Sequence, residues 1–331
     1  MKSILRVALA LALFPTLASA GTVGMGDSLT DEYQFPIFTP AGGDRRTAKN
    51  HVELLSGLRP VDFDFGDFSA ASRGTPRNQG FEYNWGRDGS TSAEVIAEGQ
   101  HTGAAGQLAA GAADTVFMTI GANDFRSVFT SPNPPEALAQ AVPNLLQNVA
   151  TVAQAILAAS PEARLVIANL PDLRHLPELR AAVAAGLIPQ PFADAVAGAI
   201  DAYNRQLALA FAGDDRVAVA DFDAVIEGVM AGEQFTVGGV AIDRTTPGNE
   251  PNRLFVDSVH PGTVGQGLIA NAFLTASNQK FDTDYQLLSD AEILQAAGGG
   301  PTPIPLPLGV WAALGAAPVV YVAARRRRAA A

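Results

Sequence analysis

Three residues, one near the start of the chain and two close together towards its end, have the types and spacing that nucleophilic catalysis requires. Ser28 lies in the stretch GMGDSLTDEY, and Asp257 and His260 lie in DSVHPG, towards the other end. A serine hydroxyl is a useful nucleophile only when a base removes its proton, and the base must itself be oriented. Asp257 can accept a hydrogen bond from Nδ1 of His260 and leave Nε2 facing Ser28. We predict a triad of Ser28, His260 and Asp257.

A carbonyl under attack also needs donors for the negative charge that develops on its oxygen. The backbone N–H groups of Ser28 and Gly89 and the side-chain amide of Asn123 are candidates. Gly89 lies in NWGRDGST and Asn123 in GANDF. Glycine suits such a position because it lacks Cβ and lets a substrate approach the backbone closely. These three residues form the predicted oxyanion hole.

Each candidate also has a purely structural interpretation. Ser28, followed three residues later by Asp31, matches a helix capping box. Gly89 fits an ordinary turn, Asn123 fits a turn after a strand, and His260 fits a surface position before a proline. The catalytic interpretation therefore depends on whether the fold brings these residues together.

The acid of the triad has an alternative position. Asp221 or Asp223, at the end of a predicted strand, is an alternative to Asp257. Two further acids, Asp27 and Asp124, are expected to brace loops through hydrogen bonds rather than titrate in catalysis.

The apolar pattern predicts the elements that position these residues. Five strands are expected, at 22–26, 81–85, 114–120, 164–170 and 216–222, and a further half-buried strand is expected at 62–68. Helices are expected at 50–59, 90–100, 137–160 (interrupted by Pro143), 192–212 and within 253–273. Continuous rather than alternating apolar strands indicate burial on both faces, as in a parallel sheet covered by helices. We predict an α/β fold with a doubly wound, mostly parallel five-stranded sheet flanked by helices, a flavodoxin-like three-layer arrangement.

Sheets of this kind bind ligands at the carboxyl ends of their strands. Ser28, Gly89 and Asn123 follow the first, second and third predicted strands in turn. Asp257 and His260 come just before a helix that is expected to pack at the same sheet edge. The topology therefore predicts that all five residues meet there.

The same segments resemble the sequence blocks of the GDSL or SGNH hydrolases, a family of serine esterases and lipases. GDSLTDEY is similar to the first block, NWGRDGST to the second, GAND to the third and DSVHPGTVGQGLIA to the fifth, in the family's order. The resemblance implies Ser28 as the nucleophile, Gly89 and Asn123 as oxyanion donors, and Asp257 and His260 as the other triad members. It also implies the SGNH-hydrolase fold.

Two features depart from the family pattern. Gly262 follows the His-Pro pair where members often carry threonine, and the stretch from Asp31 to Arg77 is longer than in compact members. Both bear on substrate specificity more than on chemistry. We expect an ester substrate, which is an acylated small molecule, lipid or polysaccharide, and no cofactor. The alternative is a surface carbohydrate-binding or adhesion module on the same fold without turnover.

The composition argues against several kinds of site. Cysteine is absent, which rules out thiol catalysis and Cys-ligated metals. The four histidines show no H-E-x-x-H or H-x-H spacing, so no metal site is expected. The formal net charge is −11, and several of the basic residues lie at the two ends, so the body is more acidic still. Nucleic acid is not an expected partner, since phosphate binding needs a basic face.

The two ends of the chain predict an exported protein attached to a membrane. Residues 1–20 have a basic start, an apolar run and an Ala-Ser-Ala ending, as in a signal peptide. The predicted hydrolase domain covers 21–287 and is followed by a linker at 288–306. The uncharged stretch 307–324 is long enough to span a bilayer, and the arginine-rich tail 325–331 is expected to stay cytoplasmic.

The tail also resembles a PEP-CTERM sorting signal, in which a proline motif, an apolar segment and an arginine cluster follow one another. Here the motif is IPLP at 304–307, similar to the Val-Pro-Leu-Pro variants. The resemblance implies a transient anchor that an exosortase-type membrane protease removes; a permanent anchor is the alternative. The expected location is the periplasm or the cell surface.

Overall fold

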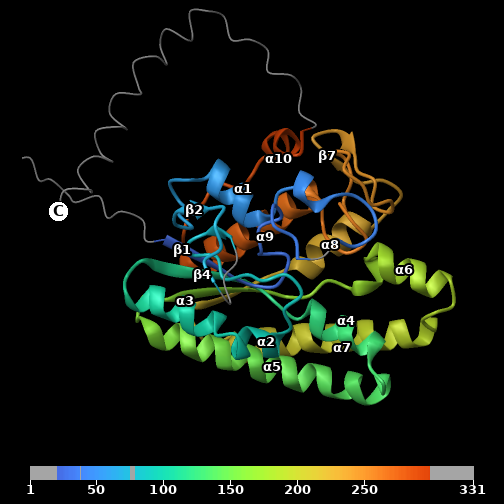
Figure 1. Ribbon diagram of the computed structural model, residues 1–331, viewed down its shortest axis with the longest axis horizontal. Helices are drawn as coiled ribbons and strands as arrows, with labels where there is room; N and C mark the ends of the chain where they lie inside the picture. The colour runs from blue at the N-terminus through green and yellow to red at the C-terminus, as the bar shows by residue number, and fades with distance from the viewer. Residues whose placement is uncertain (1–20, 38, 75–78, 299–331) are drawn as a thin grey trace, which may run out of the picture.

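The computed structural model describes residues 21–37, 39–74 and 79–298 (Figure 1). The predicted signal peptide, the membrane segment and the arginine-rich tail lie outside these residues. Within the described ranges, no helix has both the length and the apolar character needed to cross a membrane.

The described residues contain a central sheet of four parallel strands. Their order is β1 (Gly21–Gly26), β4 (Ala113–Thr119), β5 (Arg164–Ala168) and β6 (Val217–Ala220). The strands are buried over almost their whole length, as their continuous apolar sequences predict. The carboxyl ends of β1 and β4 are in register, with Gly26 beside Thr119. The predicted parallel α/β architecture is confirmed.

Helices cover both faces of the sheet and make the three layers of Figure 1. One face carries α3 (Gln100–Ala109), α5 (Pro134–Ala159) and α7 (Gln190–Phe211), and the other carries α1 (His51–Leu58), α8 (Phe222–Met230) and α9 (Thr263–Phe281). Each face has its own apolar core. On the α9 side, Phe117 of β4 stacks on Phe273 with ring centroids 4.7 Å apart.

Shorter elements fill the connections between strands. The helices are α2 (Ser92–Ala97), α4 (Ala122–Thr130), α6 (Pro177–Ala184) and α10 (Asp290–Ala296), with 3-10 turns η1 (Arg45–Thr47) and η2 (Leu173–His175). Two small antiparallel ladders join β2 (Phe68–Ser69) to β3 (Gly80–Phe81) and β7 (Thr236–Val237) to β8 (Val240–Ala241). Several of these elements carry or support residues of the site.

The predicted strand at 81–85 follows the edge of β1 but does not form a regular strand of the central sheet, which has four strands in the described residues rather than the five expected. Three backbone hydrogen bonds of 2.7–3.0 Å join residues 83–87 to Gly24 and Gly26 of β1, with an isolated parallel bridge at Gly24–Asn84. The Asn84 side chain donates to the Thr30 carbonyl at 2.7 Å. The segment thereby ties the loop after β1 to the loop that carries Gly89.

Two further expectations differ in detail. In the predicted strand 62–68, Phe63 and Phe65 are buried as expected, but residues 63–67 form no strand, Gly66 has φ +79°, and β2 begins only at Phe68. Helix α5 continues through Pro143 without interruption. Pro143 lies on the exposed side of α5, where water can hydrogen-bond the carbonyl that the missing proline N–H leaves unmatched.

The folded domain extends beyond the boundary expected at residue 287. Helix α10, within the predicted linker, places Ile293 and Leu294 in the core against α9, with exposed fractions of 0% and 5%. A Cβ on Gly267 of α9 would lie 2.8 Å from Ile293, so the two helices approach closely. Arg59 after α1 pairs with Glu292 at 2.8 Å. Residues up to Gly298 therefore belong to the domain.

Replacing Ile293 by alanine tests this boundary. Because the side chain is fully buried, we expect Ile293→Ala to lower the free energy of unfolding by about 2–5 kcal/mol. Gln295→Ala, on the exposed side of the same helix, should change it by less than about 0.5 kcal/mol. Chemical denaturation of both variants makes the comparison, and equal stabilities would show that α10 is only an appendage.

Candidate active site

Ser28 follows β1 in a tight turn that requires glycine at position 26. Gly26 has φ +122°, and a Cβ there would lie 1.8 Å from the Thr119 carbonyl oxygen of the neighbouring strand. The turn closes when the N–H groups of Thr30 and Asp31 donate to the Asp27 carbonyl, each at 3.0 Å. No helix begins at this point, so Ser28 is not a helix cap.

Ser28, His260 and Asp257 form a continuous chain of hydrogen bonds. Ser28 Oγ lies 2.9 Å from His260 Nε2, and His260 Nδ1 lies 2.8 Å from Asp257 Oδ2. Asp257 Oδ1 also accepts the backbone N–H groups of Val259 and His260 at 2.9 and 2.7 Å, which closes the loop between the two side chains. All three side chains are buried. The arrangement allows His260 to take the Ser28 proton while Asp257 holds the ring.

The surroundings favour an ionised Asp257 and a neutral His260. Burial of the imidazole lowers the pKa of His260, although the hydrogen bond and charge of Asp257 act in the opposite direction. Burial acts to raise the pKa of Asp257, but hydrogen bonds from His260 and the loop backbone outweigh it and lower that pKa. A neutral imidazole is the form that accepts a proton.

The alternative triad acids lie elsewhere. Asp221 accepts a hydrogen bond from the Asn169 amide at 2.7 Å and caps α8 through the Ala224 N–H at 3.0 Å. Asp223 lies in the first turn of the same helix. Asp257 is the acid that is hydrogen-bonded to His260.

Two of the predicted oxyanion donors lie on neighbouring segments: Gly89 in the loop before α2 and Asn123 in the first turn of α4. The Asn123 amide nitrogen donates to the Ser90 carbonyl at 3.0 Å, which leaves its second N–H for a ligand. Gly89 immediately precedes Ser90 in the sequence, and its φ of +84° is a conformation that favours glycine. Asn123 and Ser28 both line one cavity with His260. The structure thus brings Asn123 to the triad and ties the Gly89 loop to it.

Asp27 and Asp124 make the hydrogen bonds that were expected to brace these segments. Asp27 accepts the Leu29 N–H at 3.0 Å and the Thr119 hydroxyl at 3.2 Å. Asp124 accepts the N–H and hydroxyl of Ser92 at the start of α2, at 2.9 and 2.5 Å. Burial raises the pKa of Asp27 to about 7.

Two arginines at the site were not singled out from the sequence. Arg126, one turn after Asn123 on α4, donates Nη1 to the Asn123 amide oxygen at 3.0 Å and so turns the amide N–H groups towards the hole. Arg126 is itself held by Glu178 of α6 at 2.6 Å. Arg45 of η1 forms a buried bidentate pair with Asp88 and contacts His260. No sequence motif contains Arg45, so only its place in the fold could reveal it.

The long stretch after Asp31 also holds the loop of the triad acid. Ala41 accepts the Ser258 N–H at 2.7 Å, and the Gly43 N–H donates to Val256 at 2.8 Å. An antiparallel bridge joins Gly42 to Asp257. The stretch therefore forms one wall of the site.

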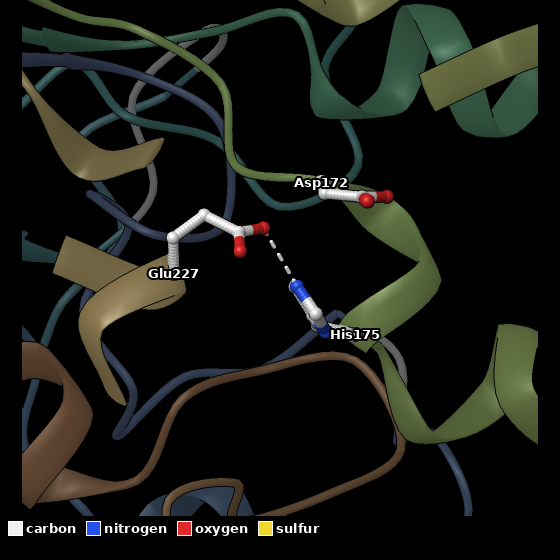
Figure 2. Close-up of side chains that lie close together, drawn as sticks. All are labelled: Asp172, His175 and Glu227. Carbon is white, nitrogen blue, oxygen red and sulfur yellow. Dashed lines mark hydrogen bonds and ion pairs between the residues drawn. The ribbon is translucent and has the colours of Figure 1, made fainter. Parts of the chain in front are cut away.

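One group of side chains in the described residues has the composition of a metal site. Asp172, His175 and Glu227 bring ligand atoms within 4.8 Å of one another (Figure 2), and the first two also line the cavity that contains Ser28. His175 and Glu227 are joined at 2.8 Å, and Asp172 stands apart from that pair in Figure 2. The Asp172 carboxylate already accepts three hydrogen bonds from Arg174, so a cation would have to compete with a guanidinium.

The cavity beside Ser28 is largely apolar away from the triad. Its walls come from η2, α8 and the loop before α9, and they include Leu173, Leu176, Phe222, Ile226, Phe255 and Val259. A nucleophile, a base and an amide donor thus face an apolar chamber. This arrangement suits attack on a carbonyl whose substituent is hydrophobic.

We expect Asp257→Asn to lower kcat for an activated ester by roughly 10³ to 10⁴-fold with little change in melting temperature. The asparagine oxygen can still accept the two backbone N–H groups. Its amide donates to Nδ1, however, and forces the ring proton onto Nε2, where it blocks acceptance from Ser28. Initial rates and thermal melts on the same preparation test this.

The matched control is Asp223→Asn, which removes an alternative acid. It should leave kcat within about twofold of the wild-type value, because substitutions at half-buried positions away from the site have small effects. Loss of activity in the control together with full activity in Asp257→Asn would assign the acid role to Asp223.

Comparison with known proteins identifies the family of the chain. Residues 23–273 match the family described as GDSL-like lipase/acylhydrolase. None of the curated proteins compared matches this chain. Similar solved structures include an extracellular lipase from Streptomyces rimosus, with 20% identity over 79% of this chain and 100% of that chain and a TM-score of 0.44. Phospholipase A1 from Streptomyces albidoflavus has 19% identity over 80% of this chain and 100% of that chain and a TM-score of 0.45. A family 3 carbohydrate esterase from Clostridium thermocellum has 16% identity over 79% of this chain and 96% of that chain and a TM-score of 0.40. Because the family match spans most of the sequence, this chain belongs to the GDSL-like lipase/acylhydrolase family.

Proposed function

We propose that the protein hydrolyses carboxylic esters through an acyl-enzyme on Ser28. The hydrogen-bond chain from Ser28 Oγ through both His260 nitrogens to Asp257 is the observation that carries the proposal. A binding module would have no need to bury an ionised carboxylate and an imidazole behind a serine hydroxyl, because that burial is costly. Turnover explains why these groups are there.

The reaction has two halves. Ser28 Oγ attacks the ester carbonyl while its proton passes to His260 Nε2, and the oxyanion is held by the N–H groups of Ser28, Gly89 and Asn123. The intermediate collapses, and the departing alcohol takes the proton from His260. Water then attacks the acyl group, with its proton accepted by His260, and the carboxylic acid leaves as Ser28 regains its proton.

The apolar cavity supports esters with a hydrophobic acyl group as the substrate class. Ile226 of α8 and Leu173 of η2 lie on its walls and are almost fully buried. Each buried methylene group contributes about 0.8 kcal/mol to binding. An acetyl group alone would leave most of these walls without contact.

We also propose export and membrane attachment through the terminal segments. The basic and apolar residues at 1–20 and the apolar stretch before the arginines at 325–328 support this. The mass of the mature protein tests both ends: a product that retains residues 1–20 would contradict export, and loss of the arginines would favour exosortase-type processing over a permanent anchor.

Ser28→Ala should abolish both ester hydrolysis and covalent labelling by a fluorophosphonate, with the fold unchanged. The labelled wild-type protein should gain the mass of one phosphonyl group on the peptide that contains Ser28. Ser72→Ala, an exposed serine, is the control and should label like the wild type. A label on any other residue, or turnover by folded Ser28→Ala, would refute the acyl-enzyme proposal.

Across p-nitrophenyl acetate, butyrate and hexanoate, kcat/KM should rise by roughly fourfold per methylene group until the cavity is filled, because each methylene group is worth about 0.8 kcal/mol. Ile226→Trp narrows the cavity and should reduce the rate on hexanoate while preserving the rate on acetate, which serves as an internal control. A preference for acetate in the wild type, together with faster release of acetate from acetylated polysaccharides, would favour a carbohydrate O-deacetylase.

A further inference from the structure

Arg45 places a buried cation against the atom that must accept the Ser28 proton. Its Nη1 lies 2.9 Å from His260 Nε2, and Ser28 Oγ lies 2.9 Å from the same nitrogen. The residue is 2% exposed. It comes from η1, in the long stretch that departs from the family pattern, and from none of the blocks that identify the family.

This contact defines the protonation state of the ring. A guanidinium has only donors, so Nε2 must be the acceptor and must carry a lone pair. The proton of the neutral ring then lies on Nδ1, where Asp257 accepts it. A protonated Nε2 would direct its own N–H at the Arg45 N–H across the same 2.9 Å. The contact is therefore compatible with neutral imidazole and incompatible with imidazolium.

We propose that Arg45 is a further catalytic residue, which holds His260 as the neutral base at rest and releases Nε2 as the Ser28 proton arrives. The inference rests on the proposed function, since it assigns His260 the role of base. The proton moves from Ser28 Oγ to Nε2, and the Arg45 N–H must withdraw from Nε2 as it does so. Arg45 itself loses no proton.

The surroundings of Arg45 allow that movement without stranding its charge. Both terminal nitrogens of the guanidinium are paired with the Asp88 carboxylate. Its central carbon lies 5.2 Å from the centre of the Tyr33 ring, in cation–π range. Asp88 immediately precedes Gly89, so the same pair links the base to the loop of the oxyanion donor. A guanidinium that leaves Nε2 keeps both of these contacts.

In the described part of the chain, the charged or titratable groups that face His260 include Asp257, Asp88, Arg45 and Tyr33, and the signs of their charges decide the pH dependence. Asp257 of its own loop and Asp88 of the loop before α2 favour the protonated ring, and Arg45 of η1 opposes it. Tyr33, whose ring meets the imidazole edge to face at 6.0 Å, stays neutral because burial raises the pKa of its hydroxyl. Burial of the imidazole comes first and the Arg45 charge adds to it, and together they lower the pKa of His260.

The expected consequence is activity that persists into mildly acidic solution. The base works only when neutral, so kcat/KM falls as the pH drops through the pKa of free-enzyme His260. Because that pKa is lowered, the pH of half-maximal kcat/KM lies below the ordinary histidine value of about 6.5. Removing the charge of Arg45 should raise the pH of half-maximal kcat/KM, and removing the charge of Asp88 should lower it.

The test measures the pH profile of kcat/KM on p-nitrophenyl butyrate with the full chain and four variants. Arg45→Gln should raise the midpoint by about one pH unit, the usual size of the effect of a charge in contact. Asp88→Asn should move it downwards, because Arg45 then acts without the opposing carboxylate. Arg45→Lys, which keeps the charge, should lie between the wild type and Arg45→Gln.

Arg46→Gln is the matched control. It makes the same substitution at the next residue, whose side chain is 62% exposed and pairs with Asp44. Its midpoint should coincide with that of the wild type. Melting temperatures of all variants identify any loss of fold, and if Arg45→Gln does not fold, Arg45→Lys and Asp88→Asn still predict shifts in opposite directions.

A titration of the imidazole by nitrogen-15 NMR in the Ser28→Ala background measures the His260 pKa without turnover. The same order of pKa values should appear there when each of the variants is combined with Ser28→Ala. A wild-type protein that hydrolyses no ester would defeat the proposed function, whereas the titration would still decide the role of Arg45. Equal midpoints in wild type and Arg45→Gln, or shifts of Arg45→Gln and Asp88→Asn in the same direction, would overturn the inference.

Discussion

Ionised groups that are buried at the carboxyl edge of the sheet are the constraint on which the site depends. A charge removed from water is costly unless hydrogen bonds and opposite charges surround it. Asp257 meets this requirement with two backbone N–H groups and the His260 ring, and Arg45 meets it with Asp88. Arg45 and His260 are 215 positions apart in the sequence, so the edge is complete only when the whole domain has folded.

The segments that carry the predicted oxyanion donors Gly89 and Asn123 are each anchored by an arginine–carboxylate pair. Arg45 holds Asp88 beside Gly89, and Arg126 holds the Asn123 amide while Glu178 holds Arg126. Preorganised donors are effective because they need not reorient as charge develops. The pairs differ in burial: the first is almost fully buried, whereas the second is partly exposed to water. The buried pair is therefore the one whose charge reaches the base.

The long stretch after Asp31 now has a physical role. Its backbone pairs with the loop of the triad acid at Gly42, and its 3-10 turn carries Arg45 to His260. The apolar cavity beside Ser28 is lined by residues of η2 and α8, and Arg45 is not among its lining residues. The buried cation and the apolar walls are therefore separate features of the site, and the proposed reaction uses the first for proton transfer and the second for the acyl chain.

The sequence by itself determined the features that depend on local geometry. The buried strands follow from continuous apolar runs, the position of Ser28 from the end of the first strand, and the Asp257–His260 bond from a three-residue spacing that one loop can close. Only the tertiary structure decided the rest. The segment 81–85 follows the edge of β1 without forming a regular strand, and α10 joins the domain because Gly267 of α9 lets Ile293 approach closely. Arg45 and His260 are far apart in the sequence, and no local pattern can specify a contact that depends on how the same sheet places two remote loops.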